Sequence, residues 1–192
     1  MSGAPLKRTL TVKKPLAPAI PSSPSPAVLK LKIKVLSEWW PRPGTPDRLW
    51  AIPHPKKGDD FVSFPAITSG GQVFQPGSVY LLYGKHWNRH NGFGYIHIIE
   101  EHWRELKLSS KTPSPASVAQ VAKFVSEILT RPAEILCEFD NVKGNPRAIV
   151  VKGHRGRVVL DQREDLDTGL TYYSVITAMT GPNAHGFKIA SL

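Results

Sequence analysis

The sequence predicts an α+β fold in which two helices open the main domain and pack on an antiparallel sheet of four to five strands. Apolar residues recur every three or four positions across residues 91–106 and 114–131, which indicates two helices. After residue 132, short apolar runs alternate with turns that contain Gly, Asn or Pro, which is typical of antiparallel hairpins. A segment rich in loops and strands and a disordered Pro-rich arm are expected to precede this domain.

The chain divides into three parts by composition. Residues 1–27 are rich in Pro, Ser, Ala and Lys and bury too little apolar surface to fold, so we expect a disordered arm. Residues 28–83 are expected to form a small module of strands and loops, with strands at residues 29–35, 61–64 and 78–83. Residues 84–192 are expected to form the main domain.

The two helices and the sheet of the main domain have separate signals. Phe93, Ile99 and Trp103 contribute to the apolar stripe of the first helix. Ser114 is placed to cap the second helix, with Pro115 in its first turn. Strands are expected at residues 134–139, 148–152, 157–162, 171–179 and 186–191.

Charge and cysteine content restrict the class of protein. The net charge is +10, but residues 1–34 hold seven basic residues and no acid, so the remaining 18 basic and 15 acidic residues leave only +3. Cys137 is the single cysteine, which excludes an internal disulfide and is typical of a reducing compartment. No apolar run reaches eighteen residues, so we expect no membrane span, and we expect no classical signal peptide.

The first helix carries a possible catalytic constellation. His97, Glu101 and Arg104 are four and three residues apart, so they lie along one edge of the helix. A carboxylate there can orient an imidazole, and a guanidinium can meet an anion. The alternative is a solvated helix face on which His97 has no role. His102 follows His97 by five residues, not the four of zinc proteases, so we expect no metal and no cofactor.

A second cluster is basic. Lys143, Arg147, Lys152, Arg155 and Arg157 follow one another without an intervening acid, so they can neutralise phosphates, although a solvated loop is the alternative. His154 lies at the tip of the same turn.

The last long strand carries two hydroxyl side chains. Alternation places Ser174 and Thr177 on opposite faces of that strand, unless a bulge intervenes. The alternative role for both is ordinary packing within a sheet.

Several of these motifs together resemble a known group of nucleases. Three features of the chain carry the resemblance: Gly94, His97, Ile98 and His102 on the first helix, a second helix that leads into residues 133–138, and a last strand with an aromatic pair before Ser/Thr. The group that they resemble is the barnase, EndoU, colicin tRNase and RelE-like (BECR) superfamily, in its phage and polymorphic-toxin branch. The resemblance covers residues 84–192. It implies an endoribonuclease toxin that acts in the bacterial cytoplasm, is exported by a specialised system and is neutralised by an immunity protein.

RNA cleavage without a metal needs three functions: removal of the 2′-hydroxyl proton, protonation of the 5′-oxygen, and stabilisation of charge on phosphorus. We assign His97 as the general acid or base and Glu101 as its orienting partner. The remaining catalytic candidates are Arg104, Arg155 and, by the resemblance, Thr177. The substrate-binding candidates are Lys143, Arg147, Lys152, Arg157, Ser174, His102 and His154. His102 can equally be structural, and the loop residue His154 can be a bystander.

The expected partner is RNA, with tRNA as one candidate substrate. The second hypothesis is a non-catalytic interaction or delivery protein that binds anionic surfaces through its basic N-terminal arm.

Overall fold

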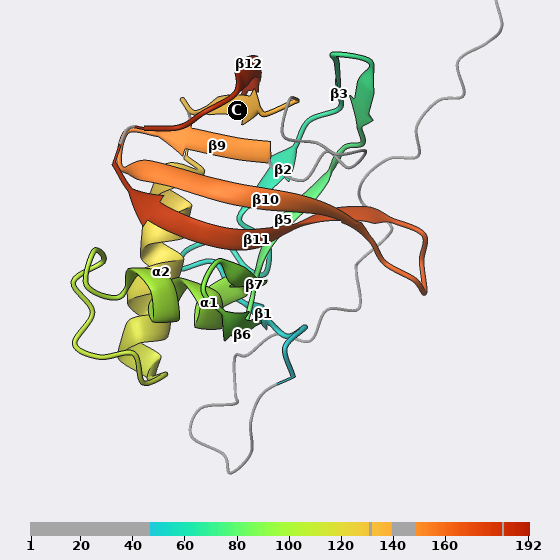
Figure 1. The fold of residues 1–192 in the computed structure, drawn as a ribbon. Coiled ribbons are helices and arrows are strands. Elements are labelled where there is room, and N and C mark those ends of the chain that lie inside the picture. Colours follow the sequence, from blue (N-terminus) through green and yellow to red (C-terminus); the bar gives the residue numbers. More distant parts are fainter. Residues whose placement is uncertain (1–46, 131, 140–148, 182) are drawn as a thin grey trace, which may run out of the picture.

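A large β-sheet organises the computed structural model, which describes residues 47–130, 132–139, 149–181 and 183–192 (Figure 1). The strand order is β1-β5-β11-β10-β9-β8-β12, and β2 also pairs with β5, which gives eight strands. Their bounds are β1 Ala51–Ile52, β2 Val62–Phe64, β5 Gly77–Leu82, β8 Glu134–Cys137, β9 Ile149–Gly153, β10 Gly156–Glu164, β11 Thr171–Thr180 and β12 Phe187–Ser191. The expected arm at residues 1–27 and the expected strand at residues 29–35 lie outside the described residues.

Two small hairpins and two helices accompany the sheet. The hairpins are β3 (Ile67–Ser69) with β4 (Gln72–Phe74), and β6 (Lys85–Asn88) with β7 (Asn91–Phe93). The helices are α1 (Gly94–His102) and α2 (Pro115–Ile128). In Figure 1, α2 lies behind the strands β9, β10 and β11, and α1 lies beside β11.

The predicted fold class is wrong. Of the described residues, 44% are strand and 17% are helix, and the sheet has eight strands where four to five were expected. Seven strands of the described chain precede α1, so the helices do not open the fold. The cause is β5, which pairs in parallel with β11 and brings β1 and β2 into the same sheet. A parallel pair joins segments far apart in sequence and leaves no turn signal between them.

The strands after α2 lie where their apolar runs predicted them. β8, β9, β10 and β11 pair with their sequence neighbours in antiparallel fashion, as the turns between them indicated. The last strand, β12, returns to pair with β8 and not with β11. The meander is therefore confirmed, but it forms only part of the sheet.

The second helix forms for the reasons visible in its sequence. The Ser114 hydroxyl accepts a hydrogen bond from the Ser117 N–H at 3.1 Å, and the Ser117 hydroxyl accepts one from the Ser114 N–H at 3.0 Å. This capping box satisfies two backbone donors, and Pro115 occupies the first turn. Val121, Val125 and other apolar residues of the helix are buried against β9 and β10.

The first helix is shorter than its apolar stripe suggested, because β7 takes up its first expected residues and a turn takes up its last ones. Tyr95, Ile98 and Ile99 form its buried side, while Ile96 is only partly buried. Gly94 has a φ of +75°, and a Cβ at this position would lie 2.4 Å from the backbone oxygen of Leu82. Glycine therefore lets the chain turn from β7 into α1 directly against β5.

The two faces of the sheet differ. Val158, Leu160 and Val175 point into the main core, which α2 closes. On the other face, Phe93 of β7 packs against Tyr80 and Leu82 of β5, so β7 and the start of α1 cover the β5–β11 side of the sheet. Cys137 is buried and free. Within the described residues no helix has the length and apolar character needed to cross a membrane.

Candidate active site

Two histidines form the centre of the candidate site. His97 comes from α1 and His86 from β6, and their Nδ1 atoms lie 3.1 Å apart. The rings are stacked, with centroids 5.3 Å apart and planes inclined by 21°. His86 pairs with Gly92 across the β6–β7 hairpin, and a Cβ at Gly92 would lie only 2.6 Å from His97 Nδ1. The absence of a side chain at Gly92 therefore makes room for the His97 ring.

Glu101 lies beside the pair but serves a different ring from the one predicted. Its Oε1 is 3.9 Å from Nε2 of His86, an ion-pair distance that is too long for a direct hydrogen bond. The predicted pairing of Glu101 with His97 is thus replaced by the order Glu101, His86, His97. His97 is the deeper ring, at 4% exposure, whereas the His86 side chain is 22% exposed.

Burial decides the protonation of His97. Loss of solvent lowers its pKa, the positive charge that His86 can carry lowers it further, and the Glu101 carboxylate opposes both effects. At neutral pH His97 is therefore an uncharged imidazole, which offers one N–H and one free nitrogen. The Nδ1–Nδ1 contact needs one proton between the two nitrogens, so His86 and His97 can exchange it.

The same side chains can also hold a metal ion. One ligand atom from each of His86, His97 and Glu101 can be chosen such that all three lie within 4.8 Å of one another. Two imidazoles and a carboxylate form a donor set typical of zinc and other transition metals. His102 takes no part in this set, because its Nδ1 is 3.0 Å from Glu105 Oε2. The arrangement thus permits either proton transfer or metal binding.

A bulge in β11 brings two hydroxyl side chains to one face. Ser174 pairs with Asp161 and Thr177 pairs with Val159, and the register shift leaves Ile176 as the extra residue. Since Val159 and Asp161 are two residues apart on β10, Ser174 and Thr177 share their face. Both hydroxyls are buried and have no hydrogen-bond partner within the described part of the chain. They lie on the strand against which α1 and β7 pack.

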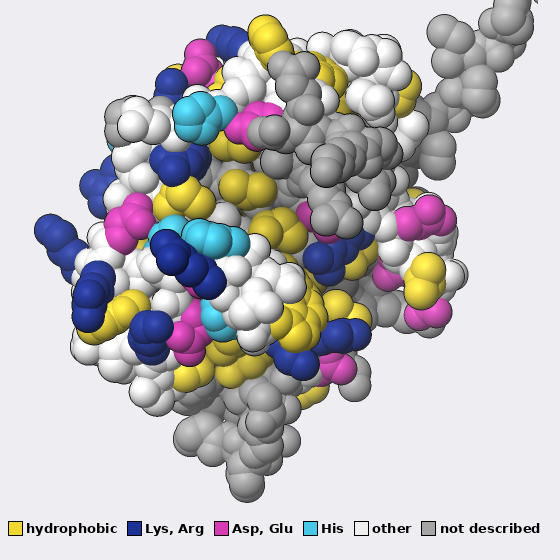
Figure 2. Space-filling model, viewed as in Figure 1, with side chains coloured by type: hydrophobic (Ala, Val, Ile, Leu, Met, Phe, Trp, Pro, Cys, Tyr) yellow, Lys and Arg dark blue, Asp and Glu magenta, His cyan; other side chains and the backbone are white. Residues whose placement is uncertain are grey.

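Two of the basic candidates lie on this same face. Arg157 pairs with Lys152 across β9 and β10, and it is two residues from Val159. Lys152 Nζ is 3.7 Å from Glu134 Oε2, and Arg157 Nη1 donates to the carbonyl of Gly181 at 3.4 Å. In Figure 2, apolar side chains are visible across the middle of the molecule, with histidine and cationic side chains near the border that α1 forms.

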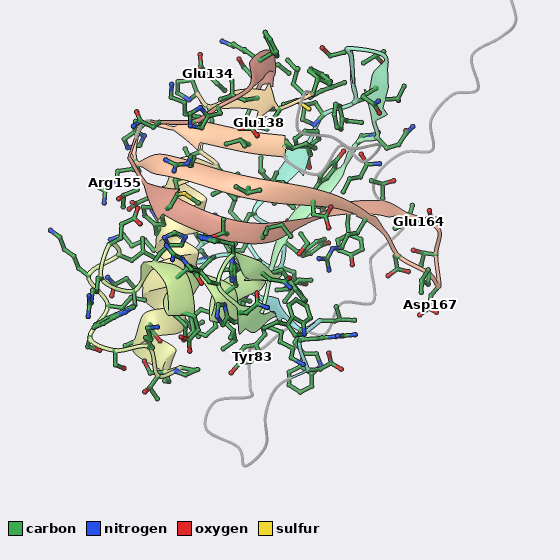
Figure 3. All side chains as sticks on the ribbon, viewed as in Figure 1. Tyr83, Glu134, Glu138, Arg155, Glu164 and Asp167 are labelled. Carbon is green, nitrogen blue, oxygen red and sulfur yellow. The ribbon has the colours of Figure 1, made fainter. Side chains whose placement is uncertain are left out.

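The other predicted site residues contact different groups or lie outside the described residues. Arg155 is paired with Glu127 of α2 at 3.3 Å, and Arg104 stacks on the Trp103 ring with its Cζ 5.2 Å from the centroid. His154 is exposed in the turn before β10. Lys143 and Arg147 lie outside the described residues. Figure 3 shows Arg155 at one end of the sheet and the acidic residues Glu164 and Asp167 at the opposite end.

His86 was not among the site residues predicted from the sequence. Residues 85–88 and 91–93 flank a two-residue turn, and such a hairpin directly before a helix places residue 86 opposite Gly92 and over the first helical turn. This spacing of hairpin and helix could have predicted that His86 lies near His97. No helix or strand was expected at residues 84–90, so His86 received no role.

Comparisons with protein-family models, with curated proteins and with solved structures found no match to this chain.

Proposed function

We propose that this chain is an endoribonuclease that cleaves RNA without a metal ion and uses His86 and His97 to transfer the proton. The observation that carries the proposal is the 3.1 Å contact between the two Nδ1 atoms. It joins a buried histidine of lowered pKa to a more exposed one with a carboxylate beside it. Paired titratable groups in different environments are typical of general acid–base sites.

In this mechanism the 2′-hydroxyl of RNA attacks the adjacent phosphorus. Nε2 of His97, which has no protein partner among the described residues, takes the hydroxyl proton as the new P–O bond forms. His86 shares the resulting positive charge through the Nδ1–Nδ1 contact, and Glu101 stabilises that charge. The proton then passes to the departing 5′-oxygen as the old P–O bond breaks, which yields a 2′,3′-cyclic phosphate and a 5′-hydroxyl.

The face of β9 and β10 supplies cationic groups for the phosphate. Lys152 and Arg157 bring positive charge, whereas the hydroxyls of Ser174 and Thr177 are buried beneath this face and are not assigned a contact with the phosphate. The wider role that we assign is that of a toxin with RNA as its target in the bacterial cytoplasm and an immunity protein as its partner. This role follows from the resemblance of the helix and strand motifs to the BECR nucleases.

The direct test is incubation of the purified chain with total tRNA in the presence of EDTA. We expect EDTA-resistant cleavage, with losses of roughly 10²- to 10⁴-fold in both His97→Ala and His86→Ala. His185→Ala is the matched control, because this histidine is exposed and is assigned no part in the site. Intact RNA from the wild type across a range of pH overturns the proposal. Activity that EDTA abolishes and zinc restores assigns His86, His97 and Glu101 to a metal instead.

The second candidate function is non-catalytic binding of a partner. It is favoured by large apolar side chains at the surface, among which Leu166 is 98% exposed and Phe187 is 63% exposed. This function predicts that Leu166→Ser weakens partner binding while His97→Ala leaves it unchanged.

A further inference from the structure

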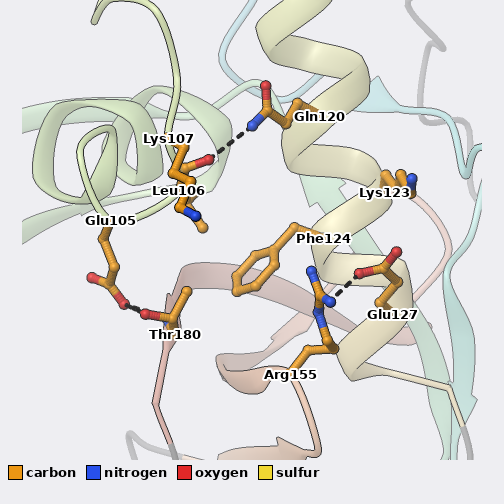
Figure 4. Close-up of a pocket in the computed structure, with 9 residues that line it drawn as sticks. All are labelled: Glu105, Leu106, Lys107, Gln120, Lys123, Phe124, Glu127, Arg155 and Thr180. Atoms are coloured by element: carbon orange, nitrogen blue, oxygen red, sulfur yellow. Dashed lines mark hydrogen bonds and ion pairs between the residues drawn. The ribbon is translucent and has the colours of Figure 1, made fainter.

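A pocket of about 540 Å³ lies next to the C-terminal end of α1 and does not include His86 or His97. Its walls come from the connection between α1 and α2, from α2 itself, from the β9–β10 turn and from the end of β11. Figure 4 shows the Phe124 ring near its centre, between Glu105 and Leu106 on one side and Arg155 and Glu127 on the other. The volume falls within the range of about 300–1,000 Å³ that is typical of small-molecule sites.

The two acidic residues of the pocket are already engaged. Glu127 pairs with Arg155 at 3.3 Å. Glu105 accepts hydrogen bonds from the backbone N–H and the hydroxyl of Thr180, the latter at 2.5 Å, and it is also bonded to His102 at 3.0 Å. These contacts fix the walls of the pocket and reduce the negative charge that an incoming anion meets.

Two cations of the pocket have no such partner. Among the described residues, neither Lys107 nor Lys123 has a carboxylate within ion-pair distance, and both are exposed. The buried edge of the pocket is aromatic, since Phe124 is 9% exposed. Free ammonium groups beside an aromatic ring form the combination that single-stranded nucleic acids use, with phosphates on the cations and a base on the ring.

The pocket is connected to the histidine pair through α1. Five residues separate His97 from His102, about 7.5 Å along a helix that rises 1.5 Å per residue. His102 is bonded to Glu105, and Glu105 to Thr180, at the border of the pocket. A strand of RNA that lies along α1 can therefore reach both places.

We propose that this pocket binds a nucleotide of the RNA substrate that lies beside the scissile phosphate, with its phosphate on Lys107 and Lys123 and its base against Phe124. The inference deepens the proposed function and rests on it, because the bound nucleotide is taken to belong to an RNA that the chain cleaves. Binding of a nucleotide can nevertheless be measured without any cleavage. Failure of the pocket and failure of the nuclease are therefore distinguishable.

The first experiment is calorimetric titration of the whole chain with 5′-AMP and, separately, with inorganic phosphate. We expect 5′-AMP to bind more tightly than phosphate, and we expect the double variant Lys107→Gln/Lys123→Gln to lose about tenfold in affinity. Lys111→Gln is the matched control, because Lys111 is an exposed lysine that pairs with Glu100 outside the pocket. Equal affinity for phosphate and 5′-AMP overturns the base contact, and unchanged affinity in the double variant overturns the site.

The second experiment compares cleavage of mixed dinucleoside phosphates with cleavage of random octanucleotides. The double lysine variant should cleave dinucleoside phosphates like the wild type, but it should lose about tenfold in kcat/KM on octanucleotides. His97→Ala should lose cleavage of both substrates and retain 5′-AMP binding. An equal loss on both substrates in the lysine variant overturns the assignment of a separate subsite.

Discussion

Gly92→Ala is the substitution that tests the histidine pair most sharply without touching a histidine. A Cβ at position 92 would lie 2.6 Å from Nδ1 and 2.9 Å from Cγ of His97, and 2.6 Å from the backbone oxygen of Lys85. Ordinary carbon contacts begin at 3.4 Å, so the ring or β7 must move by roughly 0.8 Å. That movement separates His97 from His86 and leaves both imidazoles in the protein.

The expected effects follow from the size of this displacement. A misplacement of about 1 Å in a reacting group costs on the order of 10²-fold in rate, so we expect kcat/KM for RNA to fall by about that factor. Overpacking costs roughly 1–3 kcal/mol of stability, so we expect a lower urea midpoint with a folded protein below it. Complete removal of the imidazole in His97→Ala should reduce the rate at least as far.

The assay is the initial rate of RNA cleavage, measured beside urea unfolding of the same preparation. Asn91→Ala is the control, since this neighbouring β7 residue is exposed and faces no histidine ring in the described contacts. A folded Gly92→Ala protein that cleaves RNA within twofold of wild type refutes the reasoning, because the contact at His97 Nδ1 would then have no catalytic consequence.

Three further predictions concern stability. Burial lowers the pKa of His97 below its ordinary value of about 6.5. Below that pH the unfolded chain therefore binds more protons than the folded chain, so the contribution of His97 to stability is full above that pH and is lost below it. We expect Tm to fall more steeply between about pH 7 and pH 5 in wild type than in His97→Gln. Ser117→Ala removes half of the capping box and the 2.6 Å bond to the Tyr95 hydroxyl, which should cost about 2–3 kcal/mol in urea unfolding, with a smaller loss in a Tyr95→Phe background. Leu160→Ala should cost about 2–5 kcal/mol because the side chain is fully buried, whereas Leu166→Ala, at 98% exposure, should change stability by less than about 0.5 kcal/mol. Similar losses in the two leucine variants would contradict the assigned core.

Local signals predicted most of the elements but not their assembly. Residues 78–83 read as a strand and form one, as β5, yet nothing nearby indicates that β5 pairs with β11 about ninety residues later. The turn residues of an antiparallel hairpin predict its pairing, whereas the pairing of two parallel strands depends on the packing of the whole sheet. For this reason the strands after α2 were predicted well and the eight-stranded sheet was not.

In the candidate site, too, local sequence predicted single residues but not the contacts between them. The helix spacing singled out His97 and Glu101, but the partner of both proved to be His86, which reaches them from a hairpin. Strict alternation separated Ser174 from Thr177, and the bulge at Ile176 reunites them. No glycine or proline marks that bulge in the sequence, so only the pairing with β10 reveals it.

By itself the sequence determined where the chain becomes helix or strand, because capping residues, apolar periodicity and turn residues act over a few positions. Tertiary structure alone decided which imidazole faces which, which face of the sheet α2 covers, and how deeply His97 is buried. Those features depend on contacts between segments distant in sequence, and their free energies exist only once the sheet and the β6–β7 hairpin have come together.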